Sequence, residues 1–256
     1  MPQQKISREQ ENILATRIDH LSWLDAVERI ESWARQRESR VVCICNVHSV
    51  VTAKFDRRLR TAINESDLAT PDGMPLAWLI AKRRDVNQAR ISGADLTLRL
   101  CTNAAQTGTR IAFYGSSERT LAKLSGVLHA RYPRLTIARM ISPPFRALST
   151  DEDEVMINAL NESGAGIIFV GLGCPKQEIW MAEHHGRVNA VMIGVGAAFD
   201  YIAGTVKRPP YWMQRVGLEW LGRLVAEPRR LWRRYLFTNT IFIFYILREL
   251  IGLNKH

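Results

Sequence analysis

The chain has 256 residues, of which 46% are hydrophobic and 23% charged. These proportions are typical of a folded globular protein and exclude a disordered chain. The formal net charge of +10 is unevenly placed, because residues 207–256 hold ten Lys or Arg against three Glu, a net +7. Such a local excess of positive charge indicates an anionic partner, either nucleic acid or the head groups of an acidic membrane.

Cysteine usage and the N-terminus bear on the compartment. The four cysteines form no CxxC pair, and no histidine cluster accompanies them to complete a zinc site. The first twenty residues contain no apolar core of the kind that a signal peptide needs. We therefore expect a reduced, cytoplasmic protein.

Apolar, β-branched runs alternate with segments of helical periodicity over the first 200 residues. The runs predict strands at 41–47, 111–114, 135–141, 167–170 and 191–195, and apolar spacing predicts helices at 119–132 and 151–163. Strands that alternate with helices form a parallel sheet covered on both faces. Ligands of such sheets bind beyond the carboxyl ends of the strands, so the residues that follow each strand are candidates for a site.

Several polar residues at the end of the first strand and in later turns or helix starts are candidates for the site. Asn46 and His48 end the first strand and are expected to line the cleft, with a structural histidine as the alternative. Asp72 lies between proline and glycine in a tight turn, and is either a general base for an acceptor hydroxyl or the acceptor of a plain Asx-turn. Asp95 is a substrate contact or a helix cap, and Asp200, after a glycine-rich turn, is expected at the cleft.

Glycine-rich turns follow two of the later strands. Gly115, Gly171 and Gly173 would let backbone amides approach a phosphate closely, although glycine after a strand is also common for steric reasons alone. Lys176 and Gln177 add a cation and an amide where the diphosphate or the sugar of a nucleotide would lie. This turn is therefore predicted to form one wall of a nucleotide site.

Two features leave the chemistry of this site less determined. Glu178 is either a stabiliser of the first helical turn or a ligand contact, and the first role is favoured. The sequence has no DxD pair, with which many metal-dependent sugar-nucleotide enzymes hold a divalent ion. We predict a mechanism without metal or cofactor.

The character of the sequence changes after Gly204, and we place a domain boundary near residue 206, with a catalytic domain at 1–206 and a basic appendage at 207–256. Residues 235–247 are largely apolar, but Thr238, Asn239 and Thr240 interrupt them. About 20 apolar residues are needed to span a bilayer, so this segment is predicted not to span. A basic run before an apolar one is typical of an amphipathic helix on anionic lipid; the alternative is a helix packed on its own domain or on another subunit.

An ordered set of short motifs resembles the WecG/TagA/CpsF glycosyltransferases, family 26, over roughly residues 40–235. The set consists of Asn46, Thr70-Pro71-Asp72-Gly73, Gly93-Ala94-Asp95-Leu96, Phe113-Tyr114-Gly115, Gly171-Leu172-Gly173-Cys174-Pro175-Lys176-Gln177-Glu178, Gly194-Val195-Gly196-Ala197-Ala198-Phe199-Asp200 and Gly217-Leu218-Glu219-Trp220-Leu221-Gly222-Arg223. Each motif is modest evidence by itself, but the ordered set is specific.

The resemblance implies an α/β fold with a Rossmann-like core and a C-terminal appendage that engages the membrane and helps to complete the active site. It also implies an inverting, metal-independent transfer from a UDP-sugar to a polyprenyl-diphosphate-linked saccharide on the cytoplasmic membrane face. By position, Asp72 resembles the catalytic base, and Asn46 and Gln177 resemble substrate-site residues. An appendage arginine is expected to bind the diphosphate; the candidates are Arg215 and Arg223, with Arg208 behind them.

Two questions stay open at this level. Some family members have a threonine two residues before the asparagine, whereas this chain has Ile44 at that position. The threonine hydroxyl is therefore missing, and His48 could replace it. The sugar is open between N-acetylmannosaminyl and glucosyl-type transfer in the synthesis of surface polysaccharides, and a homo-oligomer is an open possibility. The alternatives of another class are a nucleic-acid-binding module that stacks bases on Trp212, Trp220 and Trp232, and, more weakly, an oxidoreductase, for which a G-x-G-x-x-G after the first strand is missing.

Overall fold

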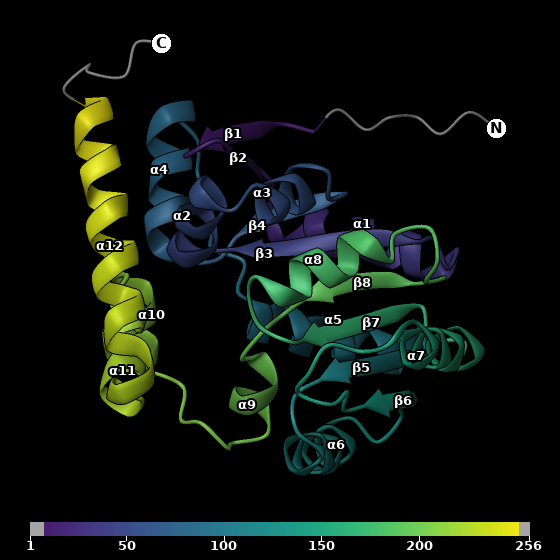
Figure 1. The fold of residues 1–256 in the computed structure, drawn as a ribbon. Coiled ribbons are helices and arrows are strands. Elements are labelled where there is room, and N and C mark those ends of the chain that lie inside the picture. Colours follow the sequence, from purple (N-terminus) through teal and green to yellow (C-terminus); the bar gives the residue numbers. More distant parts are fainter. Residues whose placement is uncertain (1–7, 251–256) are drawn as a thin grey trace.

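A computed structural model describes residues 8–250 of the chain (Figure 1). Its centre is a six-stranded sheet in which every pair of neighbouring strands is parallel. In spatial order the strands are β4 (Leu68–Pro71), β3 (Arg40–Cys45), β8 (Val191–Gly194), β7 (Ile167–Gly171), β5 (Ile111–Gly115) and β6 (Ile137–Ile141). All six carboxyl ends therefore lie at one edge of the sheet, where the candidate residues were expected.

Helices cover both faces of the sheet because alternate residues of the central strands are apolar on each side. One face packs against α1 (Trp23–Arg35), α5 (Gly93–Thr107), α6 (Glu118–Arg131) and α9 (Ala198–Ile202). The other face packs against α2 (Val47–Phe55), α3 (Arg57–Asn64), α4 (Met74–Arg84), α7 (Thr150–Glu162) and α8 (Lys176–Glu183). Phe113 stacks on Phe169 in the first layer, with 5.3 Å between ring centroids, and the next residue, Tyr114, stacks on Trp180 in the second. The α/β prediction is confirmed.

The predicted strands are confirmed to within about two residues, but three strands were not predicted. β4 is short and ends at Pro71, so its sequence has the composition of a turn. The hairpin of β1 (Gln10–Ile13) and β2 (Thr16–Asp19) forms a separate two-stranded sheet beside β4. The Asp19 carboxylate ties the hairpin to β4, since it accepts a hydrogen bond of 2.6 Å from the Ala69 N–H.

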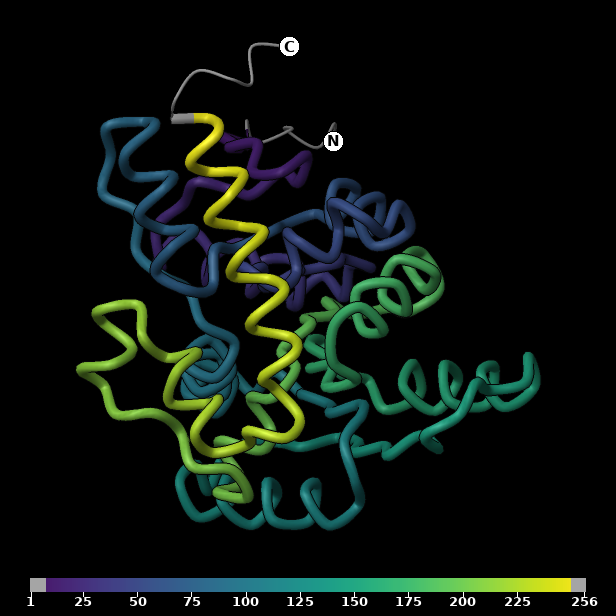
Figure 2. The backbone as a smooth tube through the Cα atoms, turned by 60° about the vertical axis from the view of Figure 1, so that its left-hand side comes forward, coloured from purple at the N-terminus to yellow at the C-terminus, as the bar shows by residue number. Residues whose placement is uncertain are grey.

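The C-terminal part consists of α10 (Tyr211–Arg215), α11 (Glu219–Ala226) and the long α12 (Pro228–Leu250). α12 runs across the molecule alongside α2 (Figures 1 and 2). Its inward face buries Leu231, Tyr235, Thr238 and Phe242. The predicted limits at residues 1 and 256 lie outside the described residues.

One face of α12 packs on α2 and the core beneath it, whereas the other carries exposed apolar side chains. These are Trp232, Leu236, Phe237, Ile243, Phe244 and Leu247. Of the three polar residues that interrupt the apolar run, Thr238 lies on the inward face, where it is buried and donates a hydrogen bond to the Arg234 carbonyl, whereas Thr240 is exposed. Within residues 8–250 the structure contains no helix that is both long and apolar enough to cross a bilayer.

Candidate active site

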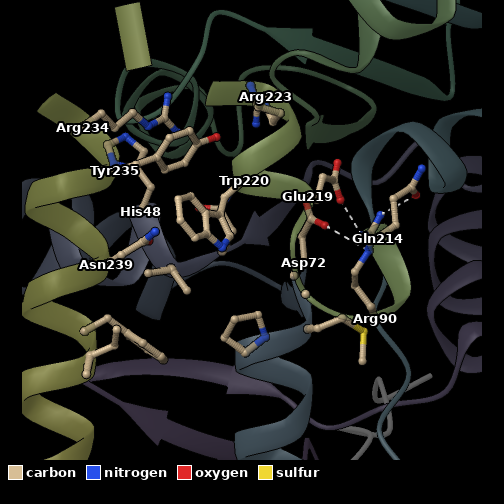
Figure 3. A pocket seen from close by; sticks show the side chains of 18 residues that line it. His48, Asp72, Arg90, Gln214, Glu219, Trp220, Arg223, Arg234, Tyr235 and Asn239 are labelled. Atoms are coloured by element: carbon tan, nitrogen blue, oxygen red, sulfur yellow. Dashed lines mark hydrogen bonds and ion pairs between the residues drawn. The ribbon is translucent and has the colours of Figure 1, made fainter. Parts of the chain in front are cut away.

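Two neighbouring cavities lie between the carboxyl edge of the sheet and the C-terminal helices. The first, of about 540 Å³, is enclosed by the glycine-rich loops after β7 and β8 and is called the glycine-loop cavity. The second, of about 250 Å³, lies beneath α11 and α12 and is called the α12 cavity (Figure 3). Five residues line both: Asn46, Asp72, Glu219, Arg223 and Arg234.

Asp72 lies on this shared wall because of the way β4 ends. Its backbone N–H donates a 2.6 Å hydrogen bond to the Cys45 carbonyl, which extends the pairing of β3 and β4 by one step. Gly73 follows with a φ of +105°, a backbone conformation that favours glycine, and turns the chain into α4. A quarter of the Asp72 side chain stays exposed, toward the two cavities.

Arg90 connects Asp72 to the C-terminal helices. Its Nε lies 3.6 Å from Asp72 Oδ1, while its terminal nitrogens bind the Glu219 carboxylate of α11 and, at 3.3 Å, Gln214 Oε1 of α10 (Figure 3). Only 9% of the Arg90 side chain is exposed. Burial raises the pKa of Asp72 to about 7, and Glu219 acts in the same direction, whereas Arg90 opposes both.

A second ion pair closes the glycine-loop cavity. Arg208 holds both oxygens of Asp95, at 2.6 and 2.7 Å, and also donates to Ser92 Oγ. Although burial opposes it, these hydrogen bonds from Arg208 and Ser92 lower the pKa of Asp95. The two predicted substrate contacts therefore bind each other here, and the helix cap is Ser92 rather than Asp95.

Arg223 and Arg234 are the cations of the shared wall. The Nε atom of each is buried without a hydrogen-bond partner among the described residues. The Arg223 guanidinium also lies 5.6 Å from the centre of the Tyr201 ring. His48 faces this pair in the α12 cavity, and burial together with the two arginines lowers its pKa to about 3. The histidine is therefore neutral near pH 7.

Asn46 and Gln177 fix the loops around the cavities. Asn46 Oδ1 caps α2 by accepting from the Ser49 N–H. Gln177 Oε1 accepts from the N–H groups of Gly173 and Gly196, at 3.1 and 3.0 Å, so one side chain joins the loops after β7 and β8. Both residues line the glycine-loop cavity, but their side-chain oxygens already accept hydrogen bonds within the protein.

Two predicted site residues lie elsewhere. Lys176 is exposed and lines a separate hollow beside Trp180, because the turn into α8 sends it to the opposite side from Gln177. Arg215 is exposed on α10, where its guanidinium lies 6.0 Å from the Tyr211 ring centre. The predictions that Lys176 and Arg215 face the cavity are corrected accordingly.

Gly115 is explained by packing. A Cβ atom on Gly115 would lie 2.6 Å from the carbonyl carbon of Gly171, and one on Gly171 would lie 2.6 Å from the Phe199 ring. Gly173, by contrast, has open space around it and lines the glycine-loop cavity with Gly171 and Asp200. The Asp200 carboxylate also accepts a hydrogen bond from Thr205.

Ile44 and His48 occupy different cavities. Ile44 lines the glycine-loop cavity, whereas His48, on the first turn of α2, lines the α12 cavity. His48 therefore does not replace the missing threonine hydroxyl in the glycine-loop cavity.

Three residues of the site were not predicted individually. Arg90 lies in an irregular segment with no motif, and Arg234 is one of several arginines in a basic run. Glu219 belongs to the motif at 217–223, but only Arg223 of that motif was singled out. Glu219 could have been identified because it is one of only three acidic residues in the basic segment 207–256.

The arrangement places a carboxylate of near-neutral pKa between two cavities, with arginines on the same wall. Such a site can remove a proton from a nucleophile and stabilise an anionic leaving group. The family model described as "Glycosyl transferase WecG/TagA/CpsF family" matches residues 11–256. The chain therefore belongs to the WecG/TagA/CpsF family and is a glycosyltransferase.

Proposed function

We propose that the enzyme transfers a sugar, with inversion, from a UDP-sugar to a polyprenyl-diphosphate-linked saccharide in the synthesis of bacterial surface polysaccharides. The observation that carries this proposal is the position of Asp72 on the wall shared by two cavities of different character. A transferase that joins two bound substrates needs such a group between them.

The glycine-loop cavity suits the UDP-sugar. Its open glycine, Gly173, leaves room for a ligand at the end of β7. Arg223 and Arg234 supply positive charge on its wall for a diphosphate, whereas the charge of Arg208 is matched by Asp95. This role for arginines agrees with a metal-independent mechanism.

The α12 cavity suits the lipid-linked acceptor. Its lining includes the apolar side chains of Trp220, Tyr235, Phe242 and Ile243. It also includes His48 and the two shared arginines, and Tyr235 lies next to His48 and Arg234 (Figure 3). An acceptor that carries both a polyprenyl chain and a diphosphate needs both kinds of surface. Several residues of α12 line the cavity, and the outer face of this helix is also apolar.

The reaction follows from this placement. The acceptor hydroxyl oxygen attacks the anomeric carbon while Asp72 takes the hydroxyl proton. The bond between the anomeric carbon and the β-phosphate oxygen breaks, and UDP leaves with the electron pair as an anion next to the arginines. Attack opposite to the leaving group inverts the anomeric configuration.

The outer face of the C-terminal helices suits the inner surface of the cytoplasmic membrane. Exposed apolar residues of α12 alternate with exposed arginines, which are Arg229, Arg230, Arg233 and Arg248. Apolar insertion together with attraction to anionic head groups is the usual basis of peripheral binding.

The test is incubation of the purified enzyme with a polyprenyl-diphosphate-linked saccharide and, in turn, UDP-hexoses and UDP-N-acetylhexosamines, followed by product mass spectrometry. We expect one mass increment, of a hexose or an acetamido sugar. Asp72→Asn should fold normally and lose at least about a hundredfold in rate, whereas Asp151→Asn, at an exposed aspartate of α7, should not. Absence of transfer from every UDP-sugar, or full activity of a folded Asp72→Asn enzyme, would contradict the proposal.

A further inference from the structure

Glu178 is a buried acid on the first turn of α8 that the proposed reaction does not use. Only 1% of the residue is exposed, although a glutamate that merely favours the positive end of a helix lies normally at the surface. Glu178 lines the glycine-loop cavity together with Asn46, Ser49, Cys174 and Gln177. It therefore forms part of the floor of the cavity.

The two carboxyl oxygens of Glu178 differ in their surroundings. Oε1 accepts a 2.9 Å hydrogen bond from Gln177 Nε2, the side chain that joins the two glycine loops. Oε2 is buried and has no hydrogen-bond partner within residues 8–250. A buried polar atom without a partner destabilises a protein, so its retention in a cavity wall indicates a ligand.

We propose that Glu178 Oε2 forms a hydrogen bond with a hydroxyl group of the donor sugar and so helps to select that sugar. This inference rests on the proposed function. A hydroxyl group suits the position because it can donate to a carboxylate and accept from a carboxylic acid. A phosphate does not, since it repels a carboxylate, and the arginines on the wall of the cavity provide its complement.

Gln177 holds the Glu178 carboxyl group in place. Burial raises the pKa of this group, whereas the hydrogen bond from Gln177 acts in the opposite direction. Because Gln177 fixes Oε1, Oε2 has one orientation relative to the glycine loops. A side chain held in this way discriminates between sugars by the position of one hydroxyl group.

The first experiment separates sugar from nucleotide. Calorimetry would compare UDP with the UDP-sugar that the wild-type enzyme uses, for the wild type and for Glu178→Gln. We expect the variant to bind UDP unchanged and the UDP-sugar about tenfold more weakly. Glu183→Gln, at the exposed end of the same helix, is the matched control and should bind both ligands as the wild type does.

The second experiment identifies the hydroxyl group with a series of UDP-deoxysugars, each lacking one hydroxyl. For the sugar that lacks the hydroxyl bound by Oε2, the wild type and Glu178→Gln should have equal kcat/KM. For the other deoxysugars, kcat/KM of the variant should be about tenfold lower than that of the wild type. Equal affinity of the two enzymes for the intact UDP-sugar, or a constant difference at every position, would overturn the assignment.

A second variant covers the case in which Glu178→Gln is unstable, and the wild type tests the proposed function itself. If Glu178→Gln does not fold, Glu178→Asp, which keeps the acid but shortens it, should give the same dependence on one hydroxyl. Failure of the proposed function is recognised separately, because the wild type itself would then transfer no sugar from any UDP-sugar.

Discussion

At the scale of the residue, the protonation of Asp72 depends on how Arg90 is shared. Arg90 contacts Asp72 only at 3.6 Å, while it binds Glu219 and Gln214 more closely. Its charge is therefore largely matched by Glu219, and burial dominates in raising the pKa of Asp72 to about 7. A general base works best when its pKa lies near the working pH.

This pKa predicts the pH dependence of the reaction. Only the deprotonated base accepts a proton, so kcat/KM should rise about tenfold per pH unit below pH 7 and level off above it. His48, whose pKa is lowered to about 3, stays neutral over this range, so His48→Gln should keep the same midpoint. Initial rates from pH 5.5 to 8.5 check this, and residual Asp72→Asn activity that still rises through pH 7 would assign the titration to another group.

The sequence identified Asp72 but not the residues that set its pKa. Asp72 stands between proline and glycine, a local pattern that is visible in one sequence. Arg90 has no such pattern, because its role arises from a contact with Glu219, 129 residues further along the chain. The direction in which a side chain points is equally hard to predict from the sequence. Lys176 and Gln177 are adjacent, yet the first turn of α8 directs only Gln177 into the glycine-loop cavity.

At the scale of the element, α11 contributes to the active site through one side chain. Glu219 begins this helix and binds Arg90, so the helix and the base are electrostatically connected. Removal of its charge frees Arg90 to act on Asp72. The effect on the base should be a lower pKa, since a nearby cation favours the carboxylate.

Glu219→Gln tests this connection. We expect the midpoint of the pH profile to fall by about one unit. Glu227→Gln is the control, because Glu227 pairs with Arg230 on the same group of helices and does not line the cavities. An unchanged midpoint in Glu219→Gln would show that Glu219 does not influence Asp72.

The exposed face of α12 makes a separate prediction. Leu236 and Phe244 are each more than half exposed, so the double variant Leu236→Gln, Phe244→Gln should fold normally. Loss of two apolar anchors should weaken binding to anionic vesicles at least about tenfold in a sedimentation assay. Transfer to a short-chain, water-soluble acceptor should not change.

Matched substitutions on the opposite part of the surface provide the control. Leu24 and Val155 are exposed to a similar degree on α1 and α7, and Leu24→Gln, Val155→Gln should bind vesicles as the wild type does. Equal vesicle binding by all three proteins would contradict a lipid-facing role for α12.

Short elements limited what the sequence could predict of the fold. The runs at β5, β7 and β8 are apolar on both faces, because helices cover both sides of the central strands, and they were located closely. β4 has four residues and ends in proline, so pairing with β3 rather than local preference determines it. Thr238, Asn239 and Thr240 of α12 were predicted as a polar interruption, whereas the burial of Thr238 alone among them depends on how α12 packs against α2.

At the scale of the whole molecule, the sheet domain is nearly complete without the C-terminal helices, but the active site is not. On one face of the sheet the buried core draws on no residue beyond 206 among those described, and on the other face the only buried contribution is Phe242. Glu219, Arg223 and Arg234 of the shared wall all come from α11 and α12. Stability and catalysis should therefore depend on these helices to different degrees.

Truncation after Val206 tests this difference. The shortened chain should still unfold cooperatively, with a Tm about 5–10 °C lower, because the contacts of Phe242 and its neighbours are lost. Its transfer to a water-soluble acceptor should fall more than about a thousandfold, since the leaving-group arginines are removed. Circular dichroism and product mass spectrometry check the two parts. The α12 surface variant keeps these arginines, so it should lose only the membrane-bound reaction. A folded truncated chain that retains transfer would contradict the role of Arg223 and Arg234. A truncated chain that does not fold would show that the domains are not independent.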